Sequence, residues 1–303
     1  MEVWRWRSTP YVGVDVSANC ARLIRNSQSL LTALVLLLHI ATSQLVINVK
    51  NDGGDLVQEA INADVKQDVI YLQFQKLDGT LVKMVIDFKS EVRIFKTIVL
   101  GEEERLESQV RIMCFVTKFS KTEFISSDAM SKLRQKNPGT IRNPEEDKGS
   151  ELLTFDLSIN LDNAGRISPH IQETCKEAKG NIYTREADIK AWSKGNRAAL
   201  LYPKWAHTVK GSNLTYTSLM NAVQALPSSS SRPSCSTIQD VRLPCTCRLE
   251  VCIGWYPCGL KYCRGRDSAG NVVSYRCGIK TCKRCHSFDY HAEQKQHCLW
   301  DEP

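Results

Sequence analysis

The sequence predicts an α+β protein, in which an antiparallel sheet flanked by two helices is followed by a small disulfide-rich C-terminal domain. Three observations lead to this prediction. Apolar and polar residues alternate along several segments between residues 44 and 161, as they do in half-buried strands. Two capped helical segments accompany these strands, and ten of the thirteen cysteines lie in the last 69 residues.

The first 43 residues have the layout of a secretory leader. An apolar run from Leu30 to Ala41 follows Arg22 and Arg25, and it ends in a small-x-small cleavage pattern before Gln44. The run is shorter than the roughly 20 residues that a membrane span needs. We therefore expect cleavage after Ser43 and no stable membrane span in the mature chain, with an uncleaved anchor as the alternative.

Composition limits the class of partner. Removal of the leader leaves 36 basic and 31 acidic residues, a net charge of +5 that is spread along the chain without a basic block. This pattern argues against a nucleic-acid partner and modestly favours an anionic cell surface. The sequon Asn213-Leu214-Thr215 predicts a glycan on Asn213. Twelve cysteines remain after cleavage, an even and dense set that indicates disulfides in a secreted, extracellular protein.

Residues 44–119 read as an antiparallel meander. The turn at Asp78-Gly79 joins two of its strands, because this pair readily adopts the positive φ angles of a tight hairpin. The expected strands are 45–49, 68–75, 81–88, 92–100 and 109–119, and residues 152–161 alternate as a further strand.

Two helices are expected beside this sheet. The first covers about residues 129–136 after the capping segment 126–128. The second starts at Ser168-Pro169, where serine suits the N-cap and proline the first helical position. Because Cys175 lies on the apolar stripe of this helix and Cys114 on the apolar face of a strand, we expect them to form a disulfide. Two buried free thiols are the alternative.

The sequence divides into four regions: the leader (1–43), a sheet domain (44–186), a connecting segment that ends in a Ser/Pro linker (187–233), and a cysteine-rich domain (234–303). The cysteines of the last domain are Cys235, Cys245, Cys247, Cys252, Cys258, Cys263, Cys277, Cys282, Cys285 and Cys298. Five structural disulfides are expected, with a connectivity that spacing does not determine.

The segment Cys282-Lys283-Arg284-Cys285 also has metal-ligand or redox spacing, and three histidines lie nearby. The neighbouring cysteine pairs lack zinc-type spacing, and an oxidising compartment removes the thiolates that zinc requires. A thioredoxin-like motif would need a surrounding βαβ pattern, which is missing. We therefore expect no metal and no cofactor.

Two resemblances extend this interpretation. The run Ile86-Asp87-Phe88, then Cys114-Phe115-Val116, then Cys175 in a helix resembles a BRICHOS domain. This resemblance implies that Asp87 is a BRICHOS-type aspartate, partly buried against a helix, although a solvated strand aspartate is an equal alternative on pattern alone. Blocks elsewhere resemble the out at first family: 132–138, 255–258, 260–263, 277–279 and 298–302.

The family resemblance implies a secreted protein with a BRICHOS-like domain and a cysteine-rich C-terminal domain. Against the family pattern Cys252 and Cys285 look additional, so the resemblance suggests that they pair with each other. Aromatic residues of the C-terminal domain alternate with basic residues, which favours either a small core or interface anchors. They are Trp255, Tyr256, Tyr262, Phe288, Tyr290 and Trp300.

The motifs of serine hydrolases, zinc proteases, P-loop proteins and dinucleotide-binding proteins are missing from the sequence. We therefore expect a non-enzymatic binding protein with an extracellular or secretory-pathway protein partner. The leading hypothesis is a chaperone-like action on β-prone or hydrophobic segments through the BRICHOS-like domain. The alternative is a developmental signal or matrix-associated ligand, recognised through the C-terminal domain. The oligomeric state does not follow from the sequence.

Overall fold

The computed structural model describes residues 44–51, 53–101, 110–194, 216–227 and 232–298, which belong to one compact unit. Its larger sheet has nine strands in the order β1-β2-β3-β4-β5-β6-β9-β8-β10. These strands are β1 Leu45–Lys50, β2 Leu56–Asp64, β3 Val69–Gln75, β4 Leu81–Asp87, β5 Val92–Val99, β6 Arg111–Lys118, β8 Leu157–Ile159, β9 Ile182–Thr184 and β10 Val223–Ala225. The first six form an antiparallel meander in chain order.

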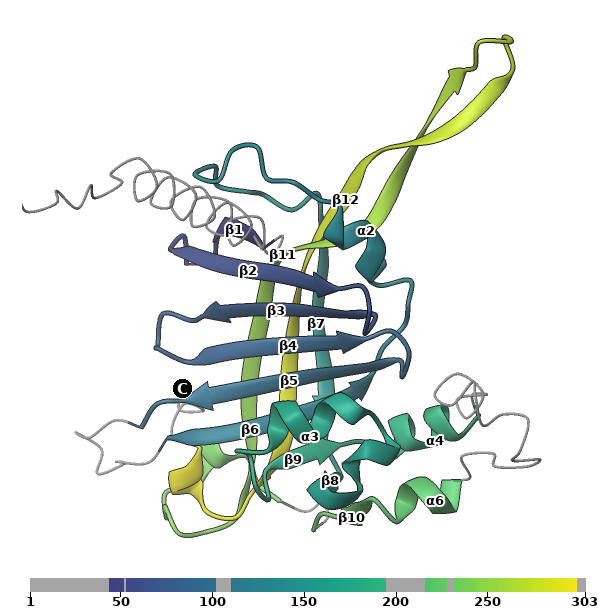
Figure 1. Cartoon of the computed structure of the whole chain (residues 1–303). Helices are drawn as coiled ribbons and strands as arrows, with labels where there is room; N and C mark the ends of the chain where they lie inside the picture. The colour runs from purple at the N-terminus through teal and green to yellow at the C-terminus, as the bar shows by residue number, and fades with distance from the viewer. Residues whose placement is uncertain (1–43, 52, 102–109, 195–215, 228–231, 299–303) are drawn as a thin grey trace, which may run out of the picture. The chain divides into compact units, whose positions relative to one another are not determined.

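The smaller sheet consists of a long hairpin and one additional strand. β11 (Cys245–Arg266) pairs antiparallel with β12 (Val272–Ala292), and β12 pairs in parallel with β7 (Glu146–Thr154). Figure 1 shows these three strands running across the strands of the larger sheet rather than alongside them. Such a crossing is the orthogonal mode of packing between two sheets.

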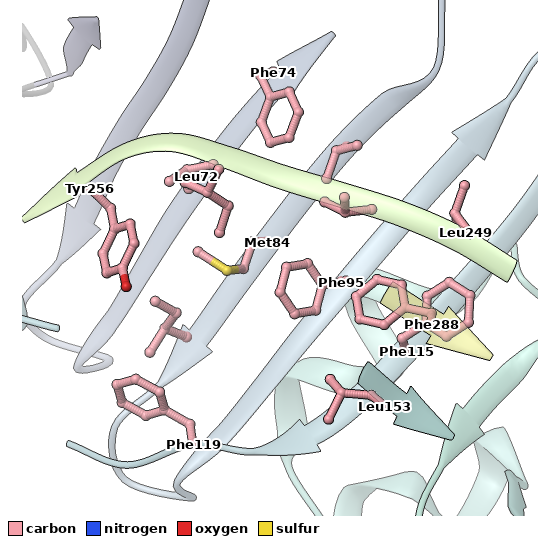
Figure 2. Packing of buried hydrophobic residues seen from close by; sticks show 14 of the residues in the cluster. Leu72, Phe74, Met84, Phe95, Phe115, Phe119, Leu153, Leu249, Tyr256 and Phe288 are labelled. Carbon is pink, nitrogen blue, oxygen red and sulfur yellow. The ribbon is translucent and has the colours of Figure 1, made fainter. Parts of the chain in front are cut away.

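Each face of the larger sheet has its own apolar core. The core between the two sheets contains Phe95 and Phe115 from the large sheet and Phe288 from β12, whose ring stacks on Phe115 at 4.5 Å between centroids. Figure 2 shows β11 passing over these side chains. On the opposite face, the core includes Ile171 and Trp192 of the short helices. These are α3 (Pro169–Cys175), α4 (Glu186–Lys194) and α6 (Tyr216–Met220).

The predicted fold class is therefore wrong. The described chain is mostly β, and the sheet is not enclosed by two helices. Short helices cover one face, while the C-terminal hairpin covers the other and shares a core with the sheet. The physical reason is that Leu249, Val251 and Ile253 of β11 form an alternating apolar face, which buries itself against the nearest large apolar surface.

Local structure departs from the sequence prediction at several places, and the short strands β9 and β10 were not expected. β2 (Leu56–Asp64) was not expected. The single strand expected over 152–161 is divided, since its first residues end β7 in the small sheet and Leu157–Ile159 form β8 in the large one. The helix after residue 126 is only Ser127–Ser131 (α2), capped by Ser126 as predicted.

The free edge of β1 is partly covered by a later segment. The Gln135 side-chain amide accepts a hydrogen bond from Val46 N–H and donates one to Val46 C=O. Ile141 forms an isolated bridge with Asn48, and Arg142 N–H donates to Asn48 C=O. These contacts occupy backbone groups that an incoming strand would use.

No helix among the described residues is long and apolar enough to cross a lipid bilayer.

A disulfide joins the large sheet to its helical layer. Cys114 of β6 is bonded to Cys175 of α3, with 61 residues separating them. Both residues are fully buried in the core beneath the helices. The chain-entropy model assigns about 4 kcal/mol to closing a loop of this length.

We predict that the double variant Cys114→Ala/Cys175→Ala lowers the free energy of unfolding by about 4 kcal/mol, because the unfolded chain regains the entropy of the long loop. Denaturant titration of the full chain measures this loss. The control is Cys263→Ala/Cys277→Ala, which opens a loop with a separation of only 14 residues outside both cores and is expected to cost less. An equal loss in both variants would contradict the prediction.

Candidate functional site

All ten C-terminal cysteines form disulfides within the hairpin and the segments at its ends. The pairs are Cys235–Cys245, Cys247–Cys298, Cys252–Cys285, Cys258–Cys282 and Cys263–Cys277. Cys282 and Cys285 therefore bond to β11 rather than to each other. Two groups of side chains have metal-like proximity, Cys235/Cys247/Cys298 and Glu250/Cys252/Cys285, but every cysteine in them belongs to a disulfide and offers no thiolate.

The hairpin meets the large sheet at a close backbone crossing. A register shift in β11 between Ile253 and Tyr256 leaves the N–H groups of Gly254 and Trp255 without partners on β12. The carboxyl group of Glu59 on β2 accepts from both, at 2.6 Å from Gly254 N and 3.1 Å from Trp255 N. A Cβ atom at position 254 would lie 2.8 Å from Cγ2 of Val49, so only glycine fits there without displacement.

Glu59 is only 1% exposed. Burial raises the pKa of its carboxyl to about 8, an effect larger than the lowering caused by the two backbone N–H groups. A buried role for Glu59 was not expected from the sequence, since an acidic residue within the run Leu56–Asp64 resembles a solvated position. The signal that could have found it is the alternation of Val57, Ile61 and Ala63, which places Glu59 on their face.

Beside the crossing lies an open groove of about 740 Å³. Val49, Phe74 and Ile253 contribute apolar walls, and Lys76 at its rim pairs with Asp78. Among the described lining residues there is no histidine, and Cys252 and Cys285 are bonded to each other. The groove therefore has no nucleophile with an adjacent histidine base.

A second cluster of ionisable groups lies between the sheets. Arg93 of β5 and Arg284 of β12 both lie within 4 Å of the carboxylates of Glu123 and Glu151, and His286 Nδ1 is 3.4 Å from Glu151. The close approach of His286 and the two arginines lowers the pKa of Glu151 to about 2, while burial and Arg93 lower that of His286 to about 4. The void beside them is about 20 Å³, which is too small for a substrate. The cluster therefore joins the two sheets through ion pairs.

The outer end of the hairpin differs from the rest. We define the ribbon as Leu260–Arg266 of β11 and Val272–Lys280 of β12, with the turn between them. Figure 1 shows this part of the hairpin extending beyond the large sheet. Most of its side chains are exposed, including Tyr262 (60%), Val272 (70%) and Tyr275 (53%). The first pairing of β12 with β7 occurs at Cys282, so the ribbon itself is only two strands wide.

Two disulfides and a turn hold the ribbon in shape. Cys258–Cys282 crosses its base and Cys263–Cys277 crosses its middle. At the tip the Asp267 carboxylate accepts from the N–H groups of Ala269 and Asn271, and Gly270 adopts a φ of 84°. The ribbon is therefore a disulfide-cross-linked extension that contributes little to either core.

Asp87 lies at the junction of β4 and the helical layer. Its carboxylate accepts from Ser90 N–H at 2.9 Å and from Ser168 Oγ at 2.7 Å, and the side chain is buried. Ser168 is also the N-cap of α3 and accepts from His170 N–H. Asp87 thus positions the first turn of the helix that carries Cys175.

The remaining predicted positions fall into different environments. Trp255, Tyr256, Phe288 and Tyr290 are buried in the core between the sheets, whereas Tyr262 is on the exposed ribbon. Asn213, Trp300 and the leader lie outside the described residues.

We predict that the contribution of Glu59 to the free energy of unfolding falls as pH rises from about 5 to 8, because Glu59 stays protonated in the folded chain while it ionises near 4.5 in the unfolded chain. Glu59→Gln removes this component, which amounts to about 1.4 kcal/mol per pH unit. Denaturant titrations at several pH values measure the difference between the two proteins, and Glu250→Gln, exposed on β11, is the control. Parallel curves for the wild type and Glu59→Gln would contradict the prediction.

Comparison with known proteins covers both regions of the chain. A family model described as "Out at first" matches residues 43–192, and one described as "Out at first, C-terminal" matches residues 234–302. The "Out at first protein" of Drosophila virilis is 46% identical over 299 residues, spanning 94% of this chain and 92% of that protein.

The Drosophila melanogaster protein of the same name is 48% identical over 272 residues, which cover 86% of this chain and about half (52%) of the relative. No solved structure matches the chain. Both family models and both relatives agree, and the chain belongs to the out at first family.

Proposed function

We propose that this protein is a secreted, non-enzymatic binding protein that recognises an extracellular partner with its ribbon. The observation that carries the proposal is the ribbon itself, an exposed two-stranded extension held by Cys263–Cys277 and Cys258–Cys282. An isolated two-stranded hairpin is marginally stable in water. Cross-links that rigidify an exposed hairpin reduce the entropy lost on binding, and this supports a recognition role.

Two polar sites near the hairpin support a role without catalysis. The cluster around Arg93 and Glu151 has no room for a substrate, and the carboxyl of Glu59 is occupied by two backbone N–H groups. The groove beside Glu59 lacks a nucleophile with an adjacent histidine base among its described residues.

The disulfides support secretion. The described residues contain six disulfides, and such sets persist mainly in oxidising compartments. Together with the leader-like sequence of residues 1–43, they favour entry into the secretory pathway.

Chaperone-like capture of β-prone segments has less support than recognition by the ribbon. The two apolar cores of the large sheet are covered by the hairpin on one face and by α3, α4 and α6 on the other. The edge of β1 is partly occupied by Gln135 and Ile141. For this reason we place the binding surface on the ribbon.

Expression in cultured animal cells tests secretion. We expect the medium to contain a chain that begins at Gln44, as determined by N-terminal sequencing, since cleavage follows the small-x-small pattern at residues 41–43. Asn213→Gln is expected to remove a glycan and lower the mass by that of one N-linked chain. Retention of residues 1–43, or retention of the protein inside the cell, would contradict secretion by this route.

A ribbon-less variant tests recognition. Leu260 and Ile279 are directly opposite each other, so an Asn-Gly turn can replace residues 261–278 and close the hairpin. The replacement removes Cys263 and Cys277 together and leaves no unpaired cysteine. We expect this variant to be secreted and folded but to lose binding to cultured cells and extracellular matrix, measured with fluorescently labelled protein. Equal binding by both proteins, or no binding by the intact chain, would contradict the proposal.

A further inference from the structure

The ribbon is strongly basic. Its residues from Leu260 to Lys280 include five basic side chains and one acidic side chain, a net charge of +4 within 21 residues. The acidic residue is Asp267, whose carboxylate is directed into the turn by hydrogen bonds from backbone N–H groups. The charge of the ribbon is thus almost as large as that of the whole chain without its leader, +5, so the expectation of an evenly spread charge is wrong.

Three of the basic residues share one face. Tyr262 is opposite Arg276, Arg264 is opposite Ser274, and Arg266 is opposite Val272. Directly opposed residues of an antiparallel pair lie on the same face, and so do residues two apart along a strand. Arg264 therefore lies about 7 Å from Arg266 along β11 and at a similar diagonal separation from Arg276 across the strands, so the three form a row on this face. We call this the arginine face.

The other face of the ribbon has a structural role. The Cys263–Cys277 disulfide lies on it, and the ring of Tyr275 covers Gly265, where an added Cβ would be 3.0 Å from Cε1 of that ring. The two faces of the ribbon thus differ, with the disulfide and the packed ring of Tyr275 on one face and the guanidinium groups on the other.

The arginine face lacks neutralising partners. Lys261 pairs with Glu145 and Lys280 with Glu146, at the end of the ribbon nearest the sheets. For Arg264, Arg266 and Arg276, which are all exposed, no ion pair occurs within the part of the chain that the structure describes. Their charges are therefore available to a ligand.

The size of this face distinguishes between kinds of anionic partner. It offers six side chains: Tyr262, Arg264, Arg266, Val272, Ser274 and Arg276. A stable protein–protein interface engages about 20–30 residues on each side. A linear polyanion needs only a narrow basic track, because its affinity comes from charge neutralisation and the release of bound counterions.

We propose that the arginine face binds a linear sulfated polysaccharide of the glycosaminoglycan class. The inference rests on the proposed function, for which it names the partner. Each guanidinium group can donate two parallel hydrogen bonds to the oxygens of one sulfate group, as it does to phosphate and carboxylate oxygens. Tyr262 adds a flat ring beside them, against which a sugar ring can pack.

The test measures retention of the full chain on immobilised heparin. We expect Arg264→Gln/Arg266→Gln/Arg276→Gln to elute at lower NaCl concentration than the wild type, with at least a tenfold weaker affinity at 150 mM salt. The slope of log K against log salt is expected to decrease by about 3, one for each lost cationic contact. Replacement of all three arginines by lysine should restore only part of the affinity, because lysine lacks the bidentate fork.

The matched control removes three other exposed charges. Lys66→Gln/Lys176→Gln/Lys179→Gln changes the net charge by the same amount outside the ribbon, and we expect near-wild-type elution. An equal loss of heparin affinity in both triple variants would overturn the inference, since the overall charge of the protein would then account for its retention. Retention of the arginine variant at the wild-type salt concentration would also overturn it.

Other anions distinguish the class of ligand. Immobilised poly-glutamate stands for an acidic protein and duplex DNA for a phosphate polymer, and we expect both to bind more weakly than heparin. Equal or tighter binding to either would overturn the assignment to sulfated polysaccharide. If cell binding depends on the ribbon but survives enzymatic removal of sulfated glycosaminoglycans, this inference fails while the proposed function stands. If the ribbon-less variant binds cells as well as the intact chain does, the proposed function fails.

Discussion

The position of the C-terminal hairpin depends on the contact between Glu59 and the backbone of Gly254 and Trp255. At this point the register of β11 with β12 shifts, and Glu59 accepts hydrogen bonds from two N–H groups, of which that of Trp255 is buried and that of Gly254 is partly buried. A buried carboxyl is costly by itself. Here the carboxyl removes the penalty of leaving the N–H groups of Gly254 and Trp255 without hydrogen bonds, because it accepts from both. The lack of a side chain on Gly254 allows the approach to Val49 that makes the contact possible.

This crossing divides the hairpin into an inner and an outer half with different physical support. The inner half is a three-stranded sheet, because β7 joins β12 from Cys282 onward, and its apolar face is buried on the large sheet. The outer half has neither a third strand nor a core. Its shape instead depends on Cys263–Cys277, on Cys258–Cys282 at the junction, and on the turn at Asp267. The hairpin is thus anchored at one end and available at the other.

Sequence patterns predicted the local structure better than the arrangement of the layers. Alternation identified most strands of the meander, since period two is a local property of the pleat. It missed β2 because Glu59 interrupts the apolar face between Val57 and Ile61. It also could not show that the apolar face of β11 covers the first sheet, because periodicity reveals that a face is buried but not what buries it. For the same reason, the sequence did not show that Tyr256 is buried in the core whereas Tyr262 is exposed on the ribbon.

The composition of the ribbon is unfavourable for folding alone. Three arginines on one face repel one another, and no acidic side chain of the described chain pairs with them, so they reduce the stability of an already marginal two-stranded element. The neighbouring Lys261 and Lys280 show that pairing was geometrically available close by, at Glu145 and Glu146. The unpaired charge of the three arginines therefore lowers the stability of the free protein. In the proposed complex, an anionic ligand neutralises it. The Cys263–Cys277 disulfide, on the opposite face of the ribbon from the three arginines, offsets part of that cost.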